Sequence, residues 1–207
     1  MRIESVQEGY VKSRRLEVLA DHFAKLFPEG ASILDVGSGD GGLAAAVVDR
    51  KRSLRFRGID TLVRSETHIP VAAFDGTTIP HDDNEYDYVL FSDVLHHTID
   101  PMILLREAVR VASRGIVIKD HLVQGFLAKP TLQFMDRVGN QRFGVDLPHN
   151  YWRPIQWDTA FKELDLRKEE YRTRIGLYPY WANWFFGRGL HFIARLGFPD
   201  NGSRSAE

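Results

Sequence analysis

The chain has 207 residues, of which 43% are hydrophobic and 27% charged, with a net charge of −1 and no cysteine. This length allows one α/β domain with a full core, and the composition is typical of a soluble globular protein. The small net charge argues against a polyanion as the main partner, and the lack of cysteine excludes disulfides and thiolate metal sites. We see no secretory leader and no run of about 18 apolar residues, so we expect a cytoplasmic protein.

The first predicted element is an amphipathic helix over residues 10–27, which Pro28 and Gly30 terminate. Apolar runs then alternate with helical patterns, which predicts parallel strands joined by right-handed crossovers. The expected strands are residues 32–36, 55–60, 70–74, 86–92 and 115–120, and the expected helices are residues 41–50, 61–65 and 99–111.

The alternation changes after Asp120. We expect a helix over 126–138, a turn-rich aromatic loop over 144–154, and a helix over 156–164 with Asp158 as a capping residue near its start. Strands follow over 167–175 and 189–197, and the polar residues 199–207 should form a flexible tail. Residues 1–198 are therefore predicted to form a single domain, with 1–30 as an N-terminal helical cover.

The most informative segment is ILDVGSGDGG at residues 33–42, an apolar run followed by an acid and a glycine-rich turn before a helix. This order predicts the first βα turn of a nucleotide-binding sheet, where glycines let the backbone approach a ligand closely. The spacing G-x-G-x-x-G is compatible with a dinucleotide. However, Asp35 and Asp40 would place two carboxylates beside the pyrophosphate, which the charges disfavour.

Two further acids follow the next predicted strands. Asp60 lies 21 residues beyond Gly39 (60 − 39), the spacing at which an acid reaches ribose hydroxyls, and Asp75 ends the third run. An acid after each of three successive strands favours a cationic nucleoside ligand over a dinucleotide. S-adenosylmethionine, which carries an ammonium and a sulfonium group, meets this description.

With these motifs the chain resembles a class I S-adenosylmethionine-dependent methyltransferase of the small-molecule type seen in quinone biosynthesis (methyltransferase type 11). The matching segments are ILDVGSGDGG, GID and AFDGTTIPHDDNEYDYVLFSDVLHH, within residues 33–97. The resemblance implies an α/β, Rossmann-like sheet of seven mostly parallel strands, helices on both faces, and an antiparallel last strand. It implies S-adenosylmethionine as cofactor and S-adenosylhomocysteine as product. The cofactor-binding residues that it implies are Asp35, Gly37, Ser38, Gly39, Asp60, Thr61, Asp75, Gly76 and Ser92.

Polar residues at the ends of the later strands are the candidates for acting on the methyl acceptor. Because a base assists a hydroxyl nucleophile, we favour His121 as that base, with Asp120 orienting it or binding substrate, and His97 as the polar group facing substrate. In the alternative interpretation these side chains only satisfy backbone groups at a helix start and a strand end. The predicted acceptor-lining residues are His96, His149, Tyr151 and Trp181.

A metal site is not expected. His96, His97, Asp120, His121 and Asp136 are suitable ligand types, but they follow no recognised ligand spacing. The basic run at residues 50–57 is interpreted as a solvated face, and no nucleic-acid partner is expected.

The predicted function is methyl transfer to a small-molecule acceptor, an oxygen nucleophile on an apolar or aromatic compound, with carbon or nitrogen left open. Segments 122–157 and 176–188 should supply the acceptor side. The aromatic residues within 178–186 would roof the pocket, or alternatively form core, a dimer contact or a peripheral membrane contact. Other hypotheses are an RNA or protein methyltransferase and a non-catalytic adenosylmethionine-binding protein. The chain is expected to be a monomer or homodimer.

Overall fold

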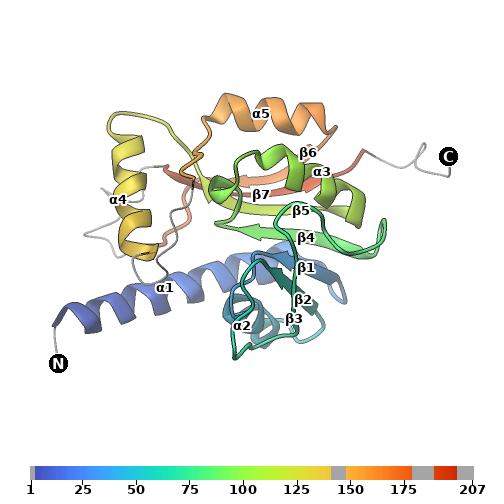
Figure 1. The fold of residues 1–207 in the computed structure, drawn as a ribbon, viewed down its shortest axis with the longest axis horizontal. Helices are drawn as coiled ribbons and strands as arrows, with labels where there is room; N and C mark the ends of the chain where they lie inside the picture. The colour runs from blue at the N-terminus through green and yellow to red at the C-terminus, as the bar shows by residue number, and fades with distance from the viewer. Residues whose placement is uncertain (1–2, 141–147, 179–188, 200–207) are drawn as a thin grey trace.

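The computed structural model describes residues 3–140, 148–178 and 189–199, in which seven strands form one sheet (Figure 1). The strand order is β3-β2-β1-β4-β5-β7-β6. Neighbouring strands from β3 to β5 are parallel, whereas β7 runs antiparallel to both β5 and β6. The seven-stranded, mostly parallel sheet with an antiparallel last strand is thus confirmed. The strands are β1 Ser32–Val36, β2 Arg55–Asp60, β3 Val71–Ala73, β4 Tyr86–Ser92, β5 Ala112–His121, β6 Arg167–Arg172 and β7 His191–Gly197.

Helices cover both faces of the sheet (Figure 1). On one face α1 and α2 bury side chains such as Phe23 and Val47 against Ile33 and Val117 of the strands. On the other face α3 and α5 pack against β4 and β5, while α4 stands beyond the carboxyl ends of the strands. The helices are α1 Ile3–Leu26, α2 Gly42–Arg50, α3 Pro101–Val111, α4 Ala128–Asn140 and α5 Pro154–Glu163, with a short 3₁₀ helix, η1, at Leu95–His97.

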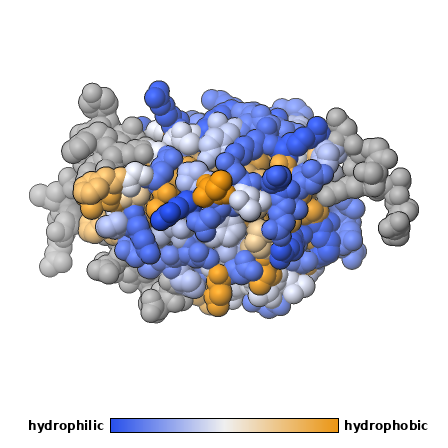
Figure 2. All heavy atoms as spheres, turned by 90° about the horizontal axis from the view of Figure 1, so that it is seen from above, coloured by the Kyte–Doolittle hydropathy of each residue, from blue (hydrophilic) through white to orange (hydrophobic). Residues whose placement is uncertain are grey.

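The outer face of α3 and α5 is mainly hydrophilic, with scattered apolar patches (Figure 2). The large exposed apolar side chains on these two helices include Ile103 and Ile155. No helix within the described ranges is long and apolar enough to cross a membrane. The candidate binding and catalytic side chains lie instead at the ends of the strands.

Two local predictions need correction. The segment 61–65 is a bend rather than a helix. Asp158 does not cap α5, because the helix begins at Pro154 with Arg153 as its N-cap. Proline is well suited to the first helical position, since its missing N–H would have no intrahelical acceptor there. Asp158 lies inside the helix and pairs with Lys168 of β6.

Candidate functional site

The loop between β1 and α2 leaves bare backbone at the end of the sheet. Gly37 has φ 73° and packs closely under Val94, whose Cγ2 would lie 2.5 Å from a Cβ added there. Gly39 has φ 61°, and a Cβ added to it would meet nothing within 4 Å. Glycine is therefore required at the first position by packing and conformation, and at the second it keeps open space beside the backbone.

Two of the predicted acids meet beside this loop. Asp35 is in β1, only 3% exposed, and Asp60 ends the neighbouring strand β2. Burial, and next the negative charge of Asp60, raise the pKa of Asp35 to about 7. Asp60 accepts hydrogen bonds from the backbone N–H groups of Gly39 (2.8 Å) and Leu62 (2.9 Å). It thereby fixes the glycine loop against the end of β2.

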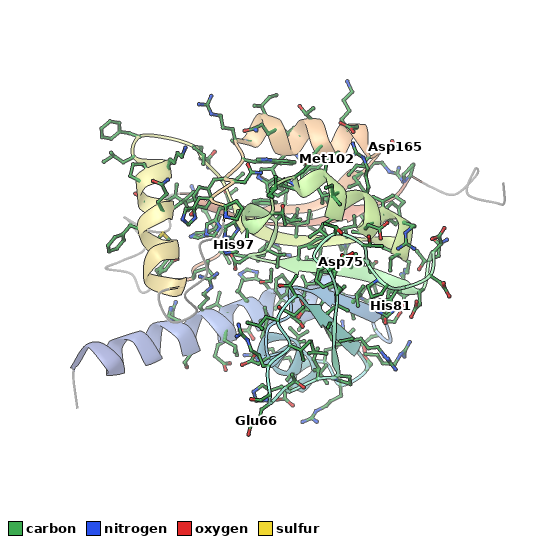
Figure 3. The ribbon with its side chains drawn as sticks, in the orientation of Figure 1. Glu66, Asp75, His81, His97, Met102 and Asp165 are labelled. Atoms are coloured by element: carbon green, nitrogen blue, oxygen red, sulfur yellow. The ribbon has the colours of Figure 1, made fainter. Side chains whose placement is uncertain are left out.

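The third acid follows β3 at the same edge and is exposed (Figure 3). One carboxylate oxygen of Asp75 accepts three hydrogen bonds, from the backbone of Thr77 and Thr78 and the hydroxyl of Thr77. These bonds hold the pKa of Asp75 below its usual value. Gly76 follows with φ 84°, close to Thr61.

This half of the site fits a cationic nucleoside such as S-adenosylmethionine. In the part of the chain that the structure describes, no lysine, arginine or histidine forms an ion pair with Asp35 or Asp60. The buried hydroxyl oxygen of Ser38 likewise has no hydrogen-bond partner there. Uncompensated carboxylates and a hydroxyl that lacks a partner are groups that the ammonium and hydroxyls of such a ligand can satisfy.

A second group of charges lies at the ends of β4 and β5. Asp93 follows β4 with φ 61°, and its carboxylate pairs with Lys119 of β5 and Arg15 of α1. Burial opposes ionisation of Asp93, but the charges of Arg15 and Lys119 hold its pKa well below the usual range. Lys119 is fully buried, and burial lowers its pKa to about 8 even though Asp93 raises it. The ion pair of Arg15 with Asp93 ties α1 to the middle of the sheet.

Three buried side chains from η1 and β5 converge beside this pair. The Nδ1 atom of His96 lies 2.6 Å from Oδ1 of Asp120 and 3.2 Å from Nδ1 of His121. Asp120 also accepts backbone N–H bonds from Leu95 (3.1 Å) and His121 (2.7 Å). Burial disfavours its charge, yet the charge of His96 and the side-chain hydrogen bonds of His121 and His96 lower the pKa of Asp120. Burial, and next the charge of His96, lower the pKa of His121 to about 4, so its imidazole is neutral near pH 7.

The structure therefore gives Asp120 a closer neighbour in addition to the one expected. Its carboxylate lies closer to Nδ1 of His96 (2.6 Å) than to Nδ1 of His121 (3.4 Å). His97, the other residue of the pair, is half-buried, with its ring centroid 3.9 Å from that of His96 (Figure 3). The proposed base and the proposed substrate-facing histidine thus share one cluster.

Of the predicted acceptor-lining residues, Tyr151 stacks on His96 with ring centroids 5.5 Å apart. The Tyr151 hydroxyl lies 3.2 Å from Nδ1 of the exposed His149. Ser92 ends β4, is half-buried and lies in register with Lys119 of β5. Trp181 lies outside the described residues.

Sequence reasoning missed His191 and the charged pair of Lys119 with Asp93. His191 faces His121 across the antiparallel β5–β7 pairing, with ring centroids 4.8 Å apart. Only the register of two strands about 70 residues apart reveals this contact. The signal for Lys119 was present, because a lysine inside the apolar run GIVIKDH rarely occurs without a buried partner.

The fold and the loop of acids and glycines define the class I, S-adenosylmethionine-dependent methyltransferase architecture. A family model described as a methyltransferase domain matches residues 10–182. The chain therefore belongs to this methyltransferase family.

Individual relatives agree with the family. An uncharacterized methyltransferase of Mycobacterium sp. (strain JLS) is 36% identical over an alignment of 96 residues, which covers 42% of this chain and 37% of the relative. This chain thus matches well under half of that relative's length. A SAM-dependent methyltransferase from Aquifex aeolicus has the same fold with a TM-score of 0.60, at 17% identity over 92% of this chain and 98% of the other. The plantazolicin methyltransferase BpumL, solved with S-adenosylhomocysteine, has a TM-score of 0.60 at 13% identity over 91% of this chain and 85% of the other.

Proposed function

We propose that this chain transfers the methyl group of S-adenosylmethionine to an oxygen nucleophile on an apolar or aromatic small molecule. The observation that carries the proposal is the pair of uncompensated carboxylates, Asp35 and Asp60, beside the bare backbone of Gly39. When bound, the cofactor supplies an activated methyl group, so that the protein has mainly to align the nucleophile.

The proposed cofactor contacts follow the order of the strands. Asp35 receives the ammonium group at the methionine end, with Gly37, Ser38 and Gly39 around it and Ser92 beside it. Asp60 and Thr61 bind the ribose hydroxyls, and Asp75 with Gly76 binds adenine. Support comes from the fact that all these positions lie at the carboxyl ends of neighbouring parallel strands, where ligands of open α/β sheets bind.

On the acceptor side, we assign proton acceptance to His121 and contact with the acceptor to His97. Methyl transfer forms the new C–O bond as the C–S bond breaks, and the hydroxyl proton passes to the imidazole. A proton acceptor must be neutral, as the lowered pKa of His121 ensures. Its weak basicity suits an acidic hydroxyl such as a phenol better than an aliphatic alcohol. Asp120 holds His96, which with His149, Tyr151 and Trp181 lines the proposed pocket.

Calorimetry with S-adenosylhomocysteine and with NAD tests the cofactor assignment. We expect S-adenosylhomocysteine to bind and NAD not to bind, and the reverse result would overturn the proposal. Turnover is then measured on a panel of phenols with His121→Ala and with His81→Ala, a control histidine that pairs with Glu85 away from the cluster. His121→Ala should slow methyl transfer while leaving cofactor affinity unchanged. Full activity in that variant would remove the proposed base.

A further inference from the structure

His96, Asp120 and His121 bring three potential ligand atoms close to one point. All three are buried, with exposures of 2%, 0% and 3%. Their converging atoms are Nδ1, Oδ1 and Nδ1, and the three separations are 2.6, 3.2 and 3.4 Å. Two imidazole nitrogens and a carboxylate oxygen facing one point form the ligand set that first-row transition metals prefer.

Only the contact between His96 and Asp120 is a short hydrogen bond. The carboxylate of Asp120 accepts, so Nδ1 of His96 uses its proton in the 2.6 Å contact. Nδ1 of His121 is then left with neighbours at 3.2 Å (His96), 3.4 Å (Asp120) and 3.8 Å (Asp93). These contacts lie at or beyond the long end of the usual hydrogen-bond range.

We infer that His96, Asp120 and His121 form a site for a divalent transition metal, for which zinc is the probe. Three ligand atoms at about 2.0–2.1 Å from one ion are separated by about 2.9–3.4 Å, depending on whether the geometry is octahedral or tetrahedral. Two of the observed separations, 3.2 and 3.4 Å, already match. Binding needs only the contact between His96 and Asp120 to open by a few tenths of an ångström.

The backbone holds the central ligand in place. The N–H groups of Leu95 and His121 donate to the two oxygens of Asp120, and such hydrogen bonds fix the orientation of a carboxylate that ligates a metal. Three protein ligands leave further coordination positions for water or an acceptor oxygen.

A neighbouring set, Asp93, His121 and His191, is less suitable. Lys119 pairs with Asp93 and its Nζ lies 3.4 Å from Nδ1 of His191, so an ammonium group already occupies that space. Asp93 in turn neutralises Lys119, which leaves Asp120 as the counter-charge for an ion on the other side of His121. The two sets share only His121. His96 belongs to the proposed site and His191 to the neighbouring set, so that substitutions of these two histidines distinguish them.

The consequence for catalysis rests on the proposed function. Nδ1 of His121 cannot hold an ion and accept a proton together. With the ion bound, the ion would instead lower the pKa of an acceptor hydroxyl that coordinates it, and the proton would pass to solvent water.

The test uses the tag-free, full-length protein after treatment with a chelator. Zinc bound per chain is measured after gel filtration, and Co²⁺ is titrated while its visible absorption is recorded. We expect one ion per chain and a cobalt spectrum with imidazole nitrogen ligation. His96→Gln should weaken zinc binding by about 100-fold or more, while His191→Gln and the control His81→Gln, away from the cluster, should change it by less than about threefold.

The inference is overturned if the wild-type protein retains no stoichiometric ion, whatever the variants do. It is also overturned if His191→Gln weakens binding as much as His96→Gln, since the ion would then lie in the other set. Binding of S-adenosylhomocysteine to the metal-free protein is measured in parallel as a check on folding. Cofactor binding without metal binding would leave the proposed function standing and remove only this site.

Discussion

The two halves of the strand-end region treat negative charge in opposite ways. At β1 and β2, the neighbouring acids Asp35 and Asp60 have no cation paired with them among the described residues, and the pKa of Asp35 rises to about 7. At β4 and β5, Asp93 and Asp120 are surrounded by Lys119, Arg15 and histidines, and both have lowered pKa values. The first half leaves its charge for a ligand to neutralise. In the second half, cationic and imidazole side chains of the protein itself already surround the carboxylates.

The largest expected effect on this difference between the two halves is the loss of stability in Asp93→Ala. The change leaves Lys119, which is fully buried, without its carboxylate partner. Removing one member of a buried ion pair costs about 3–5 kcal/mol, because the remaining charge is left uncompensated. We expect a loss of this size in the free energy of unfolding, measured by urea denaturation. The double variant Asp93→Ala with Lys119→Met should recover most of it, and a loss below about 1 kcal/mol would contradict the assignment.

Asp35→Asn should have the opposite effect on stability. In the unfolded chain the carboxyl group of Asp35 ionises with its ordinary pKa of 3.8, whereas in the folded protein it stays protonated up to about pH 7. Between these values the folded state binds more protons, so the contribution of Asp35 to stability falls as pH rises through this window. A pKa difference of about three corresponds to about 4 kcal/mol as an upper limit.

Denaturant unfolding at pH 4 and pH 8 measures this effect. The wild type and Asp35→Asn should be similar at pH 4, and the variant should be more stable by a few kcal/mol at pH 8. The same variant should lose cofactor affinity, because it lacks the carboxylate that receives the ammonium group. In the wild type, affinity should increase as pH rises through 7. A variant that is less stable at pH 8 would show that Asp35 is not destabilised by burial.

The fold could be predicted because the signals for its strands are local. The bounds of β1, β2 and β4 agree with the sequence expectation to the residue, since each contains apolar residues and is followed by a polar residue or glycine. Alternation with helices indicates a parallel sheet. The segment 61–65 was expected to be a helix and is a bend. A short segment without periodicity contains too little information to distinguish the two.

The acceptor side was less predictable for a physical reason. The cofactor acids each lie at or near the carboxyl end of a strand, so chain order places them. The contacts of Asp120 depend on how η1 packs over β5, and this packing brings His96 closer to it than the adjacent His121. His191 enters through antiparallel pairing. Such contacts are set by tertiary register, and no spacing along the chain records them.

Asp60→Ala tests whether the second acid of the cofactor half binds the ligand. The change removes the proposed ribose hydrogen bonds and the bond that holds the Gly39 N–H. We expect a loss of about 2 kcal/mol in S-adenosylhomocysteine binding, or roughly 30-fold, as is reasonable for two hydrogen bonds to a charged group. Calorimetry at pH 8 measures it, with Asp158→Ala on the surface of α5 as control. Equal affinities in the two variants would remove Asp60 from the proposed site.

The smallest effect is expected for Asp75→Asn. Asp75 is exposed, and solvent screens its charge. The amide oxygen of asparagine can still accept the three hydrogen bonds from Thr77 and Thr78, so that the turn is kept and only the charge is lost. Cofactor affinity should fall only by a few-fold, whereas Asp75→Ala, which also loses the turn, should weaken binding further. If Asp75→Asn were as damaging as Asp60→Ala, the charge at the third strand would matter as much as that at the second. In that case the contributions of Asp35, Asp60 and Asp75 to cofactor affinity would not follow how deeply each is buried.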